Sequence, residues 1–160
     1  MCPTRHELLP GRIMPTTSAL DTALEIIKKF EGCRLMAYRD QVGILTIGYG
    51  ATGPTITSHS VWTQAQAEAN LNLRVQTCIH QASVASPVLV NYPSKLAAIA
   101  SFIYNLGYGT YINSSHLLPA VNRENWTISA AEIKKFCHAG GVELPGLVRR
   151  RELESILLLQ

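Results

Sequence analysis

Hydrophobic positions recur at helical spacing where the organised part of the chain begins. Leu20, Leu24 and Ile27 follow one another at steps of four and three residues, which places them on one face of an α-helix. A serine suits the N-cap and Gly32 suits the position just past the last turn. The pattern therefore predicts a helix over 18–30.

The helical period disappears between residues 34 and 56, where glycines separate short β-prone runs. The clearest strand is predicted over 44–49. Alternation places Leu45, Ile47 and Tyr49 on a packed face. The opposite face carries Thr46 and Gly48, and we expect it to be open to a ligand that approaches the backbone closely.

Helical patterns dominate the remainder of the chain. Helices are predicted over 63–81 and 94–106, in a short piece after Ser114, over 127–138 with Gly140 and Gly141 at its end, and from Pro145 onward. The order predicts an α+β fold in which a small β lobe over about 31–62 faces a helical lobe over about 63–160, joined by the first helix, across a cleft. Residues 1–17 read as an irregular arm.

Composition narrows the classes of function. Over 160 residues the formal net charge is +3 and only 16% of residues are charged, which falls short of a nucleic-acid-binding footprint but suits an anionic polymer. No apolar stretch reaches the length of a membrane span, and none near the N-terminus has the form of a signal peptide. We expect a single domain and a monomer.

The cysteines and histidines give no metal signature. Cys2, Cys33, Cys78 and Cys137 form no CxxC pair and no two histidines lie four residues apart, so free thiols and no metal or other cofactor are expected.

Glu31 continues the apolar stripe of the first helix at its C-terminal end. Partial burial and the negative end of the helix dipole both favour a protonated carboxyl, which is what a general acid needs. A fraying terminal residue, or a carboxylate neutralised by an arginine, explains the position equally well. Asp40 taken alone reads as a turn residue and Thr46 as an ordinary strand threonine.

Two segments together resemble the signature of phage-type lysozymes of glycoside hydrolase family 24. The segment over 30–40 reads FEGCRLMAYRD and the segment over 45–50 reads LTIGYG. Further likenesses to the helical lobe of that family lie at SFIYNLG over 101–107, AGG over 139–141 and PGLVRRRE over 145–152. The resemblance covers roughly residue 18 to the end.

The resemblance implies a peptidoglycan muramidase that hydrolyses the β-1,4 bond between N-acetylmuramic acid and N-acetylglucosamine. Glu31 would be the general acid, and Asp40 and Thr46 would hold and activate the attacking water. With water attacking the opposite face of the sugar, the two carboxyl groups should lie about 6.5 to 9.5 Å apart.

The resemblance also implies contacts around this set. Gly48, Tyr49 and Asn105 would contact the sugar, although Asn105 equally suits a helix C-cap. One of the arginines at 149–151 would approach Glu31, and we expect it to be Arg150. The alternative is that these arginines form a solvated basic face of the last helix.

One departure from the family pattern follows Gly50. The family commonly has histidine where this chain has Ala51, and we expect an effect on local stability or pH dependence rather than on the reaction. In some relatives a cysteine regulates the active site by disulfide exchange, so a link between Cys2 and Cys33 is a further hypothesis.

Family members of this type remain in the host cytoplasm until lysis and reach the wall through a holin lesion. We expect the same here, with peptidoglycan as partner and neither nucleic acid nor a membrane anchor. Two alternatives are a catalytically silent module that binds peptidoglycan or a partner protein, and a lytic transglycosylase.

Overall fold

The first helix forms where its caps and apolar stripe predict it. The computed structural model describes residues 18–160, and the 1–17 arm with Cys2 lies outside the described residues. Helix α1 runs over Ala19–Glu31, Ser18 Oγ accepts from the Asp21 N–H at 3.1 Å, and Gly32 adopts φ 65° and donates to the Lys28 carbonyl. The predicted helix is confirmed.

The β lobe contains one antiparallel sheet in the order β1-β2-β3. Its strands are β1 (Arg34–Arg39), β2 (Leu45–Gly48) and β3 (Ala51–Thr52), and Tyr38 lies opposite Thr46 in the register. The strand predicted over 44–49 is confirmed as β2, one residue shorter at each end.

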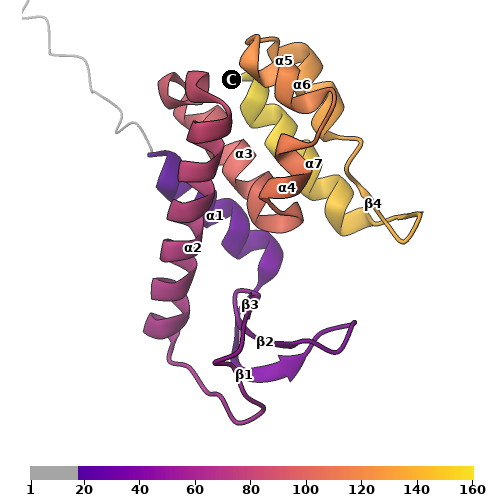
Figure 1. The fold of residues 1–160 in the computed structure, drawn as a ribbon. Coiled ribbons are helices and arrows are strands. Elements are labelled where there is room, and N and C mark those ends of the chain that lie inside the picture. The colour runs from indigo at the N-terminus through magenta and orange to yellow at the C-terminus, as the bar shows by residue number, and fades with distance from the viewer. Residues whose placement is uncertain (1–17) are drawn as a thin grey trace, which may run out of the picture.

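Helices form the rest of the chain. They are α2 (Gln64–Ala85), the 3₁₀ helix η1 (Pro87–Asn91), α3 (Pro93–Leu106), α4 (Tyr108–Ile112), α5 (Leu117–Asn122), α6 (Trp126–Ile133) and α7 (Pro145–Leu159). The local signals act as expected, because Thr63 and Gln66 form a capping box before α2, Gly107 with φ 89° ends α3, and Pro145 occupies the first turn of α7. Figure 1 shows α2 running along one edge of the molecule from the β lobe to the helices.

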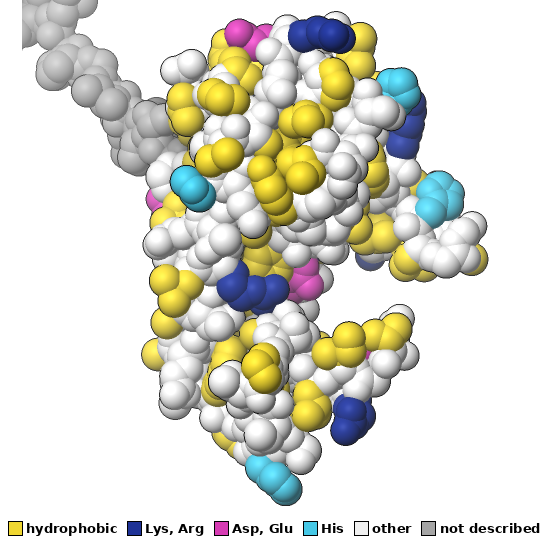
Figure 2. All heavy atoms as spheres, viewed as in Figure 1, with side chains coloured by type: hydrophobic (Ala, Val, Ile, Leu, Met, Phe, Trp, Pro, Cys, Tyr) yellow, Lys and Arg dark blue, Asp and Glu magenta, His cyan; other side chains and the backbone are white. Residues whose placement is uncertain are grey.

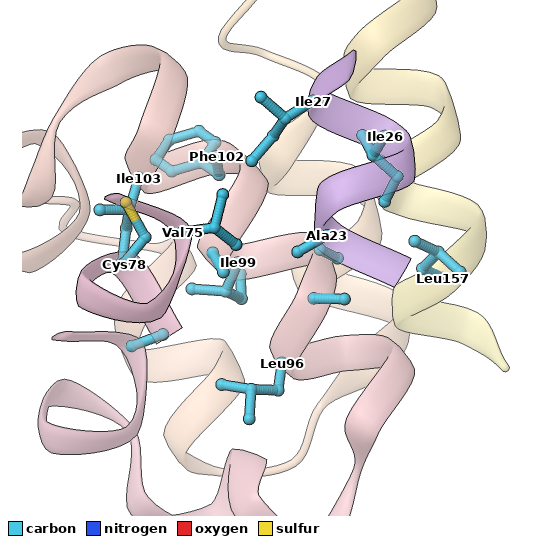
Figure 3. Packing of buried hydrophobic residues seen from close by; sticks show 14 of the residues in the cluster. Ala23, Ile26, Ile27, Val75, Cys78, Leu96, Ile99, Phe102, Ile103 and Leu157 are labelled. Carbon is cyan, nitrogen blue, oxygen red and sulfur yellow. The ribbon is translucent and has the colours of Figure 1, made fainter. Parts of the chain in front are cut away.

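The centre of the molecule is α3, which packs on α1, α2 and α7. Every residue from Lys95 to Ile103 is buried. In Figure 3, Ile99 and Phe102 of α3 lie among Ile27 of α1 and Val75 of α2. Because α1 and α7 both pack on this one buried helix, the end of α1 and the beginning of α7 are brought together.

One local prediction is wrong, and one helix was not predicted. Helix α6 ends at Ile133, and residues 138–143 form a hairpin of β4 (His138–Ala139) and β5 (Val142–Glu143). Gly140 and Gly141 therefore turn a hairpin and do not end a helix. Helix α4, directly after Gly107, was not expected.

The predicted α+β architecture is confirmed, with a small sheet on one side and a helical lobe on the other (Figure 1). Figure 2 shows the surface hollowed between the two, with basic and acidic side chains at the inner end of the hollow. Among the helices of residues 18–160, none is long and apolar enough to cross a membrane.

Candidate active site

Glu31 is the last residue of α1, and its side chain is 24% exposed. It lines a pocket of about 680 Å³ together with Asn105 from α3 and Arg149 and Arg150 from α7. The pocket therefore lies where the end of α1 meets the start of α7. The Glu31 carboxyl group therefore faces the pocket, while the backbone of Glu31 belongs to the last turn of α1.

Arg150 is the arginine that reaches Glu31. Its Nη1 donates to Glu31 Oε1 at 2.5 Å, and its side chain is only 3% exposed. Its Nη2 also donates to the Ser101 carbonyl at 3.1 Å. Arg149 is exposed, so the three adjacent arginines do not form the solvated basic face that was the alternative.

Arg150 is itself held by a buried acid that was not singled out from the sequence. Glu154 is fully buried, its carboxylate lies 3.4 Å from Arg150 Nε and 2.7 Å from Arg151 Nε, and Ser101 Oγ donates to it at 2.7 Å. Burial raises the pKa of the Glu154 carboxyl, and the two guanidinium groups oppose that effect. The positive charges of Arg150 and Arg151 formally equal the negative charges of the Glu31 and Glu154 carboxylates.

The β lobe docks beside Glu31 through the backbone at Tyr49 and Gly50. A Cβ on Gly50 would lie 3.7 Å from Glu31 Oε2, so bare backbone faces the carboxylate. The Tyr49 carbonyl accepts from Tyr104 Oη at 2.6 Å and from Arg74 Nη1 at 3.3 Å. Tyr104 and Arg74 are thus positioning residues that the sequence did not reveal, since their partner is a main-chain oxygen.

Gly48 and Tyr49 are both packed against neighbouring side chains. A Cβ on Gly48 would meet the Trp62 ring at 3.0 Å, so the missing side chain makes room for Trp62 and not for a ligand. Tyr49 is 7% exposed and belongs to the core, with its hydroxyl accepting from Gln64 Nε2 at 3.0 Å. The expected open face is wrong at Gly48, because packing between the sheet and α2 covers it, whereas Tyr49 lies on the packed face that alternation predicted. Contact of either residue with the sugar stays a prediction.

Asp40 lies in the turn between β1 and β2. Its Oδ1 accepts from the Val42 N–H at 3.0 Å and from the Ile44 N–H at 2.8 Å, which is the turn role that the single-residue reading gave it. No hydrogen bond within residues 18–160 engages Oδ2. One carboxylate oxygen therefore fixes the group and the other is available.

Thr46 and Asp40 both bond to the backbone of Ile44. Its hydroxyl donates to the Ile44 carbonyl at 3.1 Å, while the Ile44 N–H donates to Asp40. Thr46 is 4% exposed, so the expected open strand face is wrong at this position as well. The backbone of Ile44, with its N–H bonded to Asp40 and its carbonyl to Thr46, therefore connects the two polar side chains.

Asn105 lines the Glu31 pocket, and its Oδ1 is buried without a hydrogen-bond partner among the described residues. The end of α3 is closed instead by the Gly107 N–H, which donates to the Ile103 carbonyl at 2.8 Å. The C-cap role that was the alternative for Asn105 is therefore not seen, and its amide oxygen is unpartnered within residues 18–160.

Ala51 is buried in a small cluster with Ile47 and Ile56. The Ala51 methyl group fills this apolar position and needs no hydrogen-bond partner. Cys33, Cys78 and Cys137 are free thiols, and the suggested link from Cys33 to Cys2 concerns a residue outside the described range.

The family model for phage lysozyme matches residues 28–154. The chain belongs to the phage lysozyme family. The match begins just before Glu31 and ends at Glu154, so it contains the whole pocket described above.

Relatives and solved structures agree with this membership. A SAR-endolysin of Bacteriophage PS34 is 34% identical over 130 residues, which cover 81% of this chain and 76% of the relative. The endolysin of Bacillus phage PZA is 36% identical over 84% of this chain, and the match spans about half of that relative (52%). The endolysin from Escherichia coli O157:H7 phage FAHEc1 superposes with a TM-score of 0.76 at 27% identity, over 87% of this chain and 91% of the other.

The expected resemblance and the lysozyme-like fold are confirmed. Membership in the phage lysozyme family makes the chain a lysozyme-type glycosidase that acts on bacterial peptidoglycan in host lysis.

Proposed function

We propose that the chain hydrolyses the β-1,4 bond between N-acetylmuramic acid and N-acetylglucosamine, with Glu31 as general acid and with Asp40 and Thr46 positioning the attacking water. The observation that supports this most strongly is the Arg150–Glu31 pair, which fixes a carboxyl group in the wall of an open pocket of a phage lysozyme.

Glu31 must carry a proton when the leaving oxygen needs it. Arg150 Nη1 donates to the Glu31 carboxyl group at 2.5 Å, and the same guanidinium lies 3.4 Å from Glu154. These contacts fix the candidate acid in the wall of the pocket, where it would give its proton to the leaving oxygen.

Asp40 supplies the second carboxyl group in a different environment. Two backbone N–H groups donate to Oδ1 and fix the carboxyl group in the turn between β1 and β2. Asp40 Oδ2 would accept a hydrogen bond from the attacking water and then its proton. The Thr46 hydroxyl oxygen would accept a hydrogen bond from the other hydrogen of the water. An inverting glycosidase uses one carboxyl group as general acid and a second as general base, and Glu31 and Asp40 would take these two roles.

Asn105 would contact the substrate. Its unpartnered Oδ1 in the Glu31 pocket is an acceptor for a sugar hydroxyl or an acetamido N–H. Holin-dependent access to the wall and a monomeric state remain predictions.

Product analysis tests the bond and the reaction. Purified peptidoglycan is digested with the full chain, and the fragments are examined by mass spectrometry. Reducing N-acetylmuramic acid ends are expected. Anhydro ends would show a transglycosylase, reducing N-acetylglucosamine ends would show cleavage of the other bond, and absence of fragments would show a silent binding module; each of these would contradict the proposal.

A further inference from the structure

The hairpin before α7 brings together three side chains that are close in sequence but would be separated on a helix. Gly140 and Gly141 have φ 58° and 78°, the positive values that a two-residue hairpin turn needs. In the resulting register His138 lies opposite Glu143. The Leu144 N–H donates to the Cys137 carbonyl at 2.9 Å and closes the base of the hairpin.

Cys137, His138 and Glu143 point their ligand atoms at one another. Cys137 Sγ lies 3.3 Å from His138 Nδ1 and 3.6 Å from Glu143 Oε2, and the three ligand atoms all lie within 4.8 Å of one another. Tetrahedral zinc with bonds of about 2.3 Å to sulfur and about 2.0 to 2.2 Å to nitrogen and oxygen separates its ligand atoms by about 3.5 Å. The two distances from sulfur are therefore close to those of one face of a zinc tetrahedron.

We propose that Cys137, His138 and Glu143 bind one Zn²⁺. A thiolate, an imidazole and a carboxylate together suit zinc, whereas magnesium and calcium prefer oxygen ligands alone. Cys137 is 7% exposed, but His138 and Glu143 are exposed. The buried Cys137 would therefore hold the ion on the protein side, and the exposed His138 and Glu143 would leave it accessible to solvent. Water would occupy the fourth coordination position.

The charges balance on binding. Thiolate and carboxylate carry two negative charges, and a neutral imidazole leaves the site neutral once Zn²⁺ is bound. Binding replaces the thiol proton of Cys137 by the metal, and that proton leaves to solvent. Arg151, the nearby cation, is already paired with Glu154.

The position of this site relates it to the Glu31 pocket. The hairpin leads directly into Leu144, Pro145 and Gly146, which line that pocket, and Figure 1 shows it projecting beside the start of α7. A bound ion would tie residue 137 to residue 143 and so hold both ends of the hairpin. We expect zinc to stabilise this rim of the pocket without entering the glycosidic reaction.

The expectation of no metal rested on the absence of a CxxC pair and of histidines four residues apart, and residues 127–138 were separately predicted as a helix. On a helix, Cys137 and His138 point in different directions and Glu143 is remote. The hairpin changes this, because its turn returns Glu143 to the side of His138. The turn at Gly140 and Gly141 therefore brings the three side chains together.

Metal titration of the full chain tests the site. Every protein carries Cys2→Ser, so that the N-terminal thiol cannot supply sulfur. Zn²⁺ is titrated by calorimetry, and Co²⁺ is used as a spectroscopic probe of thiolate ligation. We expect one equivalent to bind, a proton to be released, a sulfur-to-cobalt absorption band to appear, and the melting temperature to rise with Zn²⁺.

The variants make the assignment specific. His138→Ala and Glu143→Gln change exposed side chains, so folding is preserved, and each should weaken Zn²⁺ by about tenfold or more. Cys137→Ser should remove the cobalt band. His116→Ala, Cys33→Ser and Glu152→Gln are matched controls at exposed positions outside the trio and should bind as the parent does. Absence of saturable binding, or equal affinity in the His138 and Glu143 variants, would overturn the proposal.

Discussion

Arg150 and Glu31 are joined by a hydrogen-bonded ion pair of 2.5 Å across 119 positions of the sequence. The contact links the start of the last helix to the end of the first. The same guanidinium contacts Glu154 and Ser101 in the interior. Glu31, the candidate acid, is thus positioned by Arg150, and buried groups fix Arg150.

Replacing Arg150 by lysine should destabilise the protein and lower its activity. Lysine keeps the charge but cannot contact Glu31, Ser101 and Glu154 at once. We expect a loss of about 1 to 3 kcal/mol in the free energy of unfolding, as for hydrogen bonds to charged groups. Urea unfolding measures it. Arg149→Lys, at an exposed position, should change stability by less than about 0.5 kcal/mol; equal losses would contradict the role of Arg150.

Gly48→Ala should destabilise the β lobe. The added Cβ would lie 3.0 Å from the Trp62 ring, and φ is 63°, so steric overlap and backbone strain add to about 1 to 3 kcal/mol. Gly146→Ala is the control, since nothing lies within 4 Å and φ is not positive. Thermal unfolding should separate the two variants. A Gly48→Ala protein as stable as the parent would show that Trp62 moves freely.

Stability should fall in alkaline solution. Burial raises the pKa of Cys78 from 9.0 to about 11, and it raises the pKa of Tyr104 and of Tyr111 from 10.0 to about 12. The unfolded chain loses these protons first, so the folded state binds more protons between pH 9 and about 12. The stabilisation is complete below pH 9 and is lost as the pH rises through that window.

Melting temperatures between pH 8 and pH 11.5 test the sign of this effect. The Tyr111→Phe variant should show a shallower decline above pH 10, because one of the shifted groups is gone. Reversible unfolding must be checked at each pH. A melting temperature that rises from pH 9 to 11, or an identical slope in the variant, would contradict the assignment.

Local signals in the sequence predicted most of the helices. Ser18, Thr63, Gly107 and Pro145 each act at the helix end where their chemistry places them. The hairpin over 138–143 was missed because an apolar period continues to the cysteine, and two glycines suit a helix end as well as a turn. Only the backbone dihedral angles distinguish these alternatives.

The candidate site was predicted in part. The position of Glu31 on the apolar stripe and the three arginines were visible in the sequence, but the contact with Arg150 was predicted only from the family resemblance. The role of Glu154 was not visible in the sequence, because an acidic residue three or four positions from an arginine ordinarily forms an exposed ion pair on a helix. Its burial depends on how α7 packs against α3, which no local pattern records. The same holds for Gly48, whose neighbour Trp62 is brought over it by tertiary packing.

The most direct test of the account is the rate of peptidoglycan solubilisation by Glu31→Gln compared with Glu25→Gln. Both variants make the same chemical change on α1, but Glu25 is exposed outside the pocket that contains Glu31 and Arg150. Circular dichroism and melting temperature establish that both are folded. We expect Glu31→Gln to lose about 10²- to 10⁴-fold in rate, the usual contribution of a general acid, and Glu25→Gln to retain the parent rate. A folded Glu31→Gln protein with full activity would contradict the assignment of Glu31 as the acid.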